Sequence, residues 1–320
     1  MCVDAIYANT LAKQNEVEVL IIDGMSDDGT LDIIQSLVSE YATLRLIANP
    51  KQVTPVAFNL GIIHSAGEFV QIIGARQLIS EDYLEKAVAC IENNPDIWCV
   101  GGRVENVFEN HESQIIANAM NTSFGVGGGN FRTVTKSAFV DTAGTPMYPR
   151  NVFEKVGLFD EELVRNQDDE FNFRIIKAGG KIFLDADILI KYFVRADYKK
   201  LFKQYLQYGY WKVYVNRKHK TVTTIRQLFP AALIAFLIIG AISSPFSVYI
   251  FVAYLSIILL YVSMAFFFAL KAMNGISQLF PIMKTFLILH ISYGWGYMKG
   301  LWDFFLLGKK ASEEQTTLSR

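Results

Sequence analysis

Residues 16–41 read EVEVLIIDGMSDDGTLDIIQSLVSEY and place a strand, a loop and a helix in direct succession. The first part, EVEVLIID (16–23), is a short run of branched apolar residues that is typical of a buried strand. The last part, TLDIIQSLVSEY (30–41), has the apolar spacing of a helix and begins directly after Gly29. A strand that leads into a helix is the repeating unit of a sheet flanked by helices, so this stretch predicts an α/β fold.

The same alternation continues as far as residue 104. Three more strands are predicted, at LRLIAN (44–49), GEFVQIIG (67–74) and DIWCVGGRV (96–104), with helices between them at 54–67 and 80–93. We therefore expect a mainly parallel sheet with helices on both faces over residues 16–104. Ligands of such sheets bind beyond the carboxyl ends of the strands. Those ends are predicted to carry Asp23, Gly74–Arg76 and Gly101–Arg103.

The composition divides the chain into a polar first part and an apolar last part. With 320 residues, a net charge of −1 and a mean hydropathy of +0.25, the sequence is too apolar for one ordinary soluble domain. The apolar residues gather in runs at 228–243, 248–270 and 279–307. The second run is long enough to cross a membrane, and the first is short. The third contains Lys284 and His290 and is expected either to cross or to lie in the interface.

Basic and aromatic residues are interleaved between residues 191 and 226, next to the first apolar run. This mixture suits the headgroup layer of a membrane, with a solvated amphipathic face as the alternative. Positive charge before the first span predicts that the polar part is cytoplasmic. A nucleic-acid partner is not expected, because basic residues cluster only near the apolar part. The three cysteines have no metal-ligand spacing and are expected to be reduced thiols.

Three carboxylates stand side by side in RNQDDEFNFR (165–174), just before a helical run. Acids in a first helical turn face the positive end of the helix dipole. Asn166 can be the N-cap of that helix, and Glu170 can pair with Arg174 one turn on. The pattern alone therefore favours a structural role for these acids.

Five stretches, taken in chain order, resemble the inverting family-2 glycosyltransferases, which have a Rossmann-like GT-A nucleotide-sugar fold. They are VLIIDGMSDDGT, GGRVENVF, TSFGVGGGNFRT, FVDTAGTPMYPRNVFEKVGLFDEELVRNQDDEFNFRIIKAGGKIFLD and LFKQYLQYGYWK. The branch that they resemble contains succinoglycan-type exopolysaccharide glucosyltransferases, and the likeness extends over nearly the whole chain. Within the third stretch, GVGGGN (125–130) can be a flexible loop that contacts the acceptor or the donor, or it can be an ordinary glycine-rich turn.

The resemblance implies a catalytic role for the acidic stretch, because the family's matching Glu-Asp motif supplies the base. Gln167 stands where the glutamate is usual, and Asp168 matches the aspartate. An inverting transfer needs a carboxylate within reach of the acceptor hydroxyl, so Asp168 is the expected base. The same resemblance assigns to the acceptor and the site loop Asp169, Glu170, Arg174, Gln204 and Trp211.

For the donor, the resemblance implies that Asp23 and its loop, with Ser26 and Asp28, hold the nucleotide of a UDP-sugar. The family's metal-binding acids are replaced in IGARQLISEDYL (73–84), where Gly74 and Arg76 occupy their positions. A divalent Mg²⁺ or Mn²⁺ would lose an oxygen ligand there, so metal dependence stays open. Arg76 offers bidentate contacts to diphosphate oxygens instead, with a surface salt bridge as the alternative. If a metal is used, Asp82 is a candidate ligand.

The family usually opens with a strand that precedes the helix matched here by CVDAIYANTLAKQ (2–14). We expect a GT-A domain at 1–190 that lacks this strand, interfacial helices at 191–226, two or three membrane helices at 227–308 and a polar tail at 309–320. The expected activity is hexosyl transfer from a nucleotide sugar to a lipid-linked glycan in surface polysaccharide synthesis, at a bacterial inner membrane. The alternative is a non-catalytic remnant or assembly subunit of the same fold.

Overall fold

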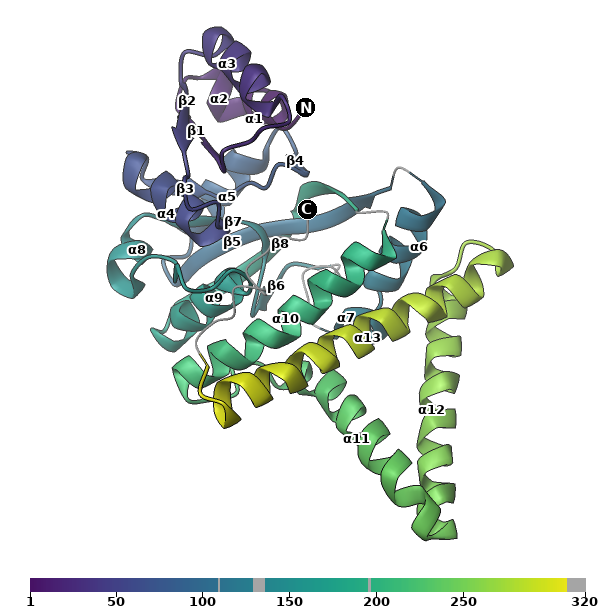
Figure 1. Cartoon of the computed structure of the whole chain (residues 1–320). Helices are drawn as coiled ribbons and strands as arrows, with labels where there is room; N and C mark the ends of the chain where they lie inside the picture. Colours follow the sequence, from purple (N-terminus) through teal and green to yellow (C-terminus); the bar gives the residue numbers. More distant parts are fainter. Residues whose placement is uncertain (109, 129–135, 195–196, 310–320) are drawn as a thin grey trace. The chain divides into compact units, whose positions relative to one another are not determined.

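The computed structural model describes residues 1–108, 110–128, 136–194 and 197–309 (Figure 1). The chain divides into two compact units. The sheet unit comprises Met1–Glu105 and Val134–Tyr192, and the helical unit comprises Asn106–Thr133 and Phe193–Arg320. The sequence patterns did not indicate that residues 106–133 join the helical unit. The predicted polar tail from residue 310 onward lies outside the described residues.

The sheet unit contains every strand and helix that was expected between residues 16 and 104, with limits that differ by a few residues. In chain order its elements are α1 (Cys2–Tyr7), α2 (Thr10–Lys13), β1 (Val19–Asp23), α3 (Thr30–Glu40), β2 (Leu44–Ala48), α4 (Thr54–His64), β3 (Phe69–Gln71), β4 (Gln77–Ile79), α5 (Tyr83–Glu92), β5 (Ile97–Val107), β6 (Ala138–Val140), β7 (Gly144–Pro149), α8 (Asn151–Val156), α9 (Gln167–Lys177) and β8 (Lys181–Phe193). The α/β class is confirmed.

The strands are not mainly parallel, contrary to the expectation. β1 and β2 form a parallel pair in which Val19 lies opposite Leu44. A second sheet has the strand order β3-β7-β5-β8-β4, with β6 beside β8. Its β3–β7, β5–β7, β4–β8 and β6–β8 pairs are antiparallel. The cause is that β7, which comes from residues 144–149, lies between β3 and β5 and pairs with both. The sequence pattern of the first hundred residues cannot predict this pairing.

The second sheet separates two apolar cores, because neighbouring residues of a strand point to opposite faces. In β7, Met147 packs with Leu84 and Ile190 on one face, whereas Tyr148 packs with Phe153 and Phe171 on the other.

Two glycines that were expected at a strand end, Gly101 and Gly102, lie inside β5. A Cβ on Gly102 would lie 2.5 Å from the carbonyl oxygen of Ile188, so close strand packing accounts for the glycine.

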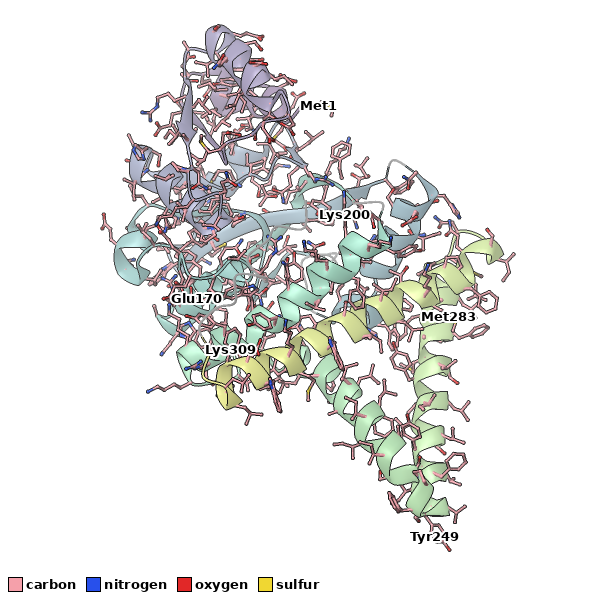
Figure 2. The ribbon with its side chains drawn as sticks, viewed as in Figure 1. Met1, Glu170, Lys200, Tyr249, Met283 and Lys309 are labelled. Carbon is pink, nitrogen blue, oxygen red and sulfur yellow. The ribbon has the colours of Figure 1, made fainter. Side chains whose placement is uncertain are left out.

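The helical unit is built from long helices. In chain order its elements are α6 (His111–Met120), α7 (Ser123–Val126), α10 (Tyr198–His219), the 3-10 helix η1 (Ile225–Leu228), α11 (Phe229–Ser243), the 3-10 helix η2 (Ser244–Phe246), α12 (Val248–Ala272), the 3-10 helix η3 (Ile276–Gln278), α13 (Leu279–Leu301) and the π-helix η4 (Trp302–Leu306). Two stretches, Ile225–Phe246 and Val248–Ala272, are long and apolar enough to cross a membrane. Their side chains are largely exposed, and Tyr249 lies at the tip of the helix pair (Figure 2).

α13 is the third apolar run, and it packs along α10 (Figure 1). Three glycines bring the two backbones close together. A Cβ on Gly209 of α10 would lie 2.0 Å from the carbonyl oxygen of Tyr293, and a Cβ on Gly296 of α13 would lie 2.0 Å from that of Leu206. Gly300 similarly faces Tyr210. Small residues at such positions allow close helix packing.

We predict that Gly296→Ala destabilises the protein by about 1–3 kcal/mol, because the added methyl group forces the α10 and α13 backbones apart. The matched control is Gly275→Ala, at a non-helical glycine where a Cβ would meet nothing within 4 Å. Thermal unfolding in detergent compares the two variants. Equal midpoints would show that close contact of α10 with α13 does not limit stability.

Candidate active site

The loop after β1 is shaped by two aspartates. Asp23 ends the strand and is 7% exposed. Its two carboxylate oxygens accept hydrogen bonds from the Ser26 backbone N–H at 2.8 Å and the Ser26 hydroxyl at 2.6 Å. Asp28 accepts a hydrogen bond from the Thr30 hydroxyl at 2.6 Å, at the start of α3. The predicted donor residues Asp23 and Ser26 are therefore together, and Asp28 lies further along the same loop.

The turn from β3 to β4 is closed by Gln77. The side-chain oxygen of Gln77 accepts a hydrogen bond from the backbone N–H of Gly74 at 2.6 Å, and the backbone N–H of Gln77 donates to the Gly74 carbonyl oxygen at 2.9 Å. A Cβ on Gly74 would lie 3.1 Å from that side-chain oxygen. Arg76 is exposed in the middle of this turn. A compact turn thus presents one guanidinium group at the position where the family resemblance implied a metal ligand.

The residues of this turn do not match the oxygen-rich ligand set of a divalent cation. Gly74 has no side chain, and Arg76 carries positive charge. The carboxylate of Asp82 is already in an ion pair with Lys86 at 2.6 Å and accepts a hydrogen bond from the Ser80 hydroxyl at 2.8 Å. The hydrogen bonds from Lys86 and Ser80 hold the pKa of Asp82 below its ordinary value. Among the described residues, no three His, Cys, Asp or Glu side chains form a metal-binding group.

The acidic stretch begins α9, as predicted. Asn166 is the N-cap residue, in a left-handed conformation with φ of +61° and no side-chain capping bond. One turn later, Phe171 is fully buried and stacks on Phe159 with ring centroids 4.3 Å apart. Ile175 is buried in the same core. These apolar side chains fix the orientation of α9, and with it the directions of the three acids.

Glu170 and Arg174 form the predicted ion pair. Glu170 is 1% exposed, and both of its oxygens accept from Arg174, each at 2.8 Å. The guanidinium also donates to the carbonyl oxygens of Val156, the last residue of α8, and of Leu158, two residues later. This pair ties α9 to the end of α8. Its geometry gives Glu170 and Arg174 a structural function, and their assignment to the acceptor site stays a prediction.

Asp168 lies two residues before Glu170, so it points to a different side of the helix. It is exposed, and Asp169 is partly buried. Asp168 interacts electrostatically with Tyr148, a fully buried residue of β7. Burial, followed by the influence of Cys99 and Asp168, raises the pKa of Tyr148 well above its ordinary value. Tyr148 therefore stays neutral beside the exposed carboxylate.

Tyr148 was not predicted from the sequence, and neither was Thr145 in the same strand. Thr145 is buried with φ of +49°, an unusual value for a β-branched residue. Its carbonyl oxygen accepts from the side chains of Gln71 at 2.6 Å and Tyr83 at 2.5 Å. Strained residues of this kind cluster at functional sites. No local signal in GTPMYP marks either residue, because both depend on contacts with distant strands and helices.

Gln204 and Trp211 lie in the helical unit. Gln204 donates from its side chain to the Tyr208 hydroxyl at 2.7 Å, one turn along α10. Trp211 is fully buried and packs against Tyr210, Tyr214 and Phe304, so it is part of the core of that unit. In the loop GVGGGN, residues 129 and 130 lie outside the described residues. The carbonyl oxygen of Gly128 accepts from Arg226 at 3.2 Å.

Comparisons with known proteins agree with this architecture. The family described as Glycosyl transferase family 2 matches residues 2–157. A dolichyl N-acetyl-alpha-D-glucosaminyl phosphate 3-beta-D-2,3-diacetamido-2,3-dideoxy-beta-D-glucuronosyltransferase of Methanococcus voltae is 30% identical over 258 residues, which cover 78% of this chain and 79% of that protein. Succinoglycan biosynthesis protein ExoA of Rhizobium meliloti is 28% identical over 67% of this chain and 65% of its own.

A solved structure shows the same fold along almost the whole chain. The mannosyltransferase PcManGT from Pyrobaculum calidifontis, in complex with GDP-Man and Mn²⁺, superposes with a TM-score of 0.64 at 16% identity. The superposition covers 94% of this chain and 82% of that one. The GT-A fold class is therefore confirmed. Taken with the 30% identity over most of both sequences, the protein is a glycosyltransferase and belongs to glycosyl transferase family 2.

Proposed function

We propose that the protein is a membrane-bound, inverting glycosyltransferase that moves a hexose from a UDP-sugar to a lipid-linked glycan in surface polysaccharide synthesis. Asp168 is the base in this proposal. The observation that carries this proposal is that three adjacent acids differ in how accessible they are. Glu170 is buried in an ion pair, Asp169 is partly buried, and Asp168 is exposed. Only an accessible carboxylate can reach an acceptor hydroxyl.

The proposed reaction is a single displacement. Asp168 accepts the proton of the acceptor hydroxyl while that oxygen forms a bond to the anomeric carbon of the donor. The bond from this carbon to the diphosphate breaks, and the nucleoside diphosphate departs with the electron pair. Attack from the face opposite the leaving group inverts the anomeric configuration. Glu170, held by Arg174, keeps α9 in place while Asp168 acts.

The leaving diphosphate needs positive charge, and Arg76 can supply it from the β3–β4 turn. A guanidinium makes bidentate contacts with phosphate oxygens. Asp23 and Ser26 form the preorganised loop that we assign to the nucleoside. A divalent cation bound with the donor would neutralise the same charge, and Mn²⁺ accompanies GDP-Man in the Pyrobaculum structure. The residues around Gly74 do not match such an ion, so no step is assigned to it.

The acceptor assignment is supported by the relatives and by the helical unit. The names of the Methanococcus and Rhizobium relatives describe a dolichyl-phosphate sugar acceptor and succinoglycan biosynthesis. The helical unit has two helices that can span a membrane, and α10 carries basic residues beside aromatic ones, as membrane interfaces favour. A lipid-linked acceptor would reach the enzyme from this membrane. The positive charge of α10 supports a cytoplasmic sheet unit in a multi-pass inner-membrane protein.

We predict that Asp168→Asn lowers kcat by about 100- to 10,000-fold, which is the range of general-base catalysis. Donor binding should be nearly unchanged, because a base acts mainly on the transition state. Transfer by the detergent-solubilised protein gives kcat, and calorimetry gives the donor Kd. The matched control is Asp169→Asn, for which we expect a loss below about tenfold. If Asp169→Asn lowered kcat more than Asp168→Asn does, the base would be Asp169.

We predict that Arg76→Ala raises the KM for the UDP-sugar more than the KM for the acceptor, because Arg76 is assigned to the donor diphosphate. Arg103→Ala is the control, since Arg103 is also an exposed arginine of the sheet unit but lies in β5. EDTA should leave transfer largely intact. If EDTA stops transfer and Mn²⁺ or Mg²⁺ restores it, a metal supplies the charge, and Asp82 is the first ligand to test.

A further inference from the structure

The short helix α7 is anchored in the helical unit by one aromatic side chain, Phe124. Its ring centroid lies 5.6 Å from that of Tyr261 and 5.3 Å from that of Phe268, both in α12. It also lies 5.0 Å from the ring centroids of Phe286 and His290, both in α13. Aromatic rings attract one another at these separations. α7 is therefore held against both α12 and α13 (Figure 1).

His290 adds two hydrogen bonds to this packing. Its Nε2 lies 2.7 Å from the carbonyl oxygen of Phe124, and its Nδ1 lies 2.8 Å from the hydroxyl of Tyr261. A carbonyl oxygen can only accept, so Nε2 carries the hydrogen, and Nδ1 accepts from the Tyr261 hydroxyl. The last carbonyl groups of a helix lack partners within that helix. His290 thus satisfies one such group of α7 and links it to α12 through Tyr261.

A glycine segment, Gly125–Gly128, follows the anchored residue directly. A Cβ on Gly125 would overlap the carbonyl oxygen of Ala119 in α6. Gly127 has φ of +84°, a conformation that side chains other than glycine rarely adopt. Gly128 is exposed, and a Cβ on it would meet nothing within 4 Å. The segment is therefore closely packed at its start and open at its end.

The open end of the glycine segment lies beside the residue that begins the first apolar stretch. Arg226 of η1 donates to the carbonyl oxygen of Gly128 at 3.2 Å, and a Cβ on Gly127 would lie 3.1 Å from the Arg226 side chain. Arg226 is the second residue of the Ile225–Phe246 stretch. Arginines at the ends of membrane helices extend to the interface. In the proposed membrane-bound enzyme, the glycine segment is therefore at the surface from which a lipid-linked acceptor approaches.

We propose that His290 is a positioning residue for the acceptor. It holds Phe124 against α12 and α13, and it thereby fixes the glycine segment in the arrangement that receives the polar end of the lipid-linked acceptor. This inference rests on the proposed function, because it requires an acceptor that approaches along the membrane. His290 touches no reacting atom and acts through the carbonyl group of Phe124.

The alternative is that the two hydrogen bonds of His290 only hold the helices together. The helices already share an apolar core that does not include His290. In this core Ala119 of α6, Ala265 of α12 and Phe286 of α13 are all buried. Loss of the hydrogen bonds should therefore leave the helical unit folded and act mainly on the glycine segment.

The first test measures hydrogen exchange by mass spectrometry on the full-length protein in detergent. His290→Phe keeps a ring beside Phe124 but removes both hydrogen bonds. Amides of the glycine segment should then exchange about two- to tenfold faster, which is the range expected from the loss of one hydrogen bond. The matched control is Ser292→Ala. Ser292 is also buried in α13, and its hydroxyl donates to carbonyl oxygens of its own helix, so exchange in the segment should not change.

Two further variants separate hydrogen bonding from ring packing. His290→Gln places an amide N–H where it can donate to the Phe124 carbonyl, so it should restore most of the protection. Tyr261→Phe keeps its ring and leaves the bond from His290 to Phe124 intact, so it should have a smaller effect than His290→Phe. If His290→Gln exchanged faster than His290→Phe, ring packing would be the cause and the proposal would be overturned.

The second test is kinetic, with UDP-glucose as donor and a polyprenyl-diphosphate-linked glucose as acceptor. His290→Phe should raise the KM for the acceptor about two- to tenfold and leave the KM for the donor within about twofold. An equal rise in both values would overturn the assignment to the acceptor. Absence of transfer by the wild-type protein would count against the proposed function instead. The exchange comparison needs no substrate, and unchanged exchange in His290→Phe would overturn the inference by itself.

Discussion

The ion pair between Glu170 and Arg174 is the interaction on which the arrangement of the acidic stretch depends. A buried carboxylate is stable only when it is paired, and removal of one partner of such a pair costs about 3–5 kcal/mol. Arg174 donates to both oxygens of Glu170 and also to two carbonyl oxygens at the end of α8 and just after it. Together with the buried side chains of Phe171 and Ile175, the pair therefore fixes the rotation of α9. Helical geometry then directs Asp168, two residues earlier, away from the pair.

Local patterns in the sequence were sufficient to predict the helices and strands of residues 16–104 and the ion pair between Glu170 and Arg174. The strand β1, the helix α3 and the pairing of Glu170 with Arg174 each depend on neighbours within a few residues. The antiparallel pairing of β7 and the position of Tyr148 near Asp168 depend on contacts between distant segments. Such contacts leave no periodic signal. The same reason explains why the sequence did not show that residues 106–133 join the helical unit.

The turn after β3, which we assign to the donor diphosphate, carries Gly74 and Arg76 where the family resemblance implies metal-binding acids. A carboxylate there would attract a divalent cation, whereas Gly74 allows Gln77 to fold back and close the turn. The closed turn exposes Arg76. A guanidinium carries one positive charge, whereas a divalent ion carries two. An arginine can therefore neutralise only part of the charge of a diphosphate, and further cationic or hydrogen-bonding groups must share the task.

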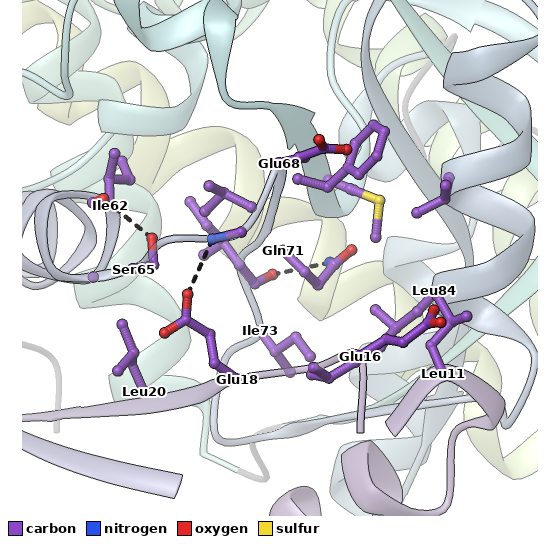
Figure 3. A pocket seen from close by; sticks show the side chains of 18 of the residues that line it. Leu11, Glu16, Glu18, Leu20, Ile62, Ser65, Glu68, Gln71, Ile73 and Leu84 are labelled. Atoms are coloured by element: carbon purple, nitrogen blue, oxygen red, sulfur yellow. Dashed lines mark hydrogen bonds between the residues drawn. The ribbon is translucent and has the colours of Figure 1, made fainter. Parts of the chain in front are cut away.

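β1 connects the stability of the sheet with the loop that we assign to the nucleotide. Asp23 is the last residue of β1, and its hydrogen bonds with Ser26 shape the loop that follows. β1 is held on one edge by β2 and at its start by Glu18. A short two-stranded pair is only marginally stable by itself, so the position of Asp23 depends on how firmly β2 and the hydrogen bonds of Glu18 hold β1 (Figure 3).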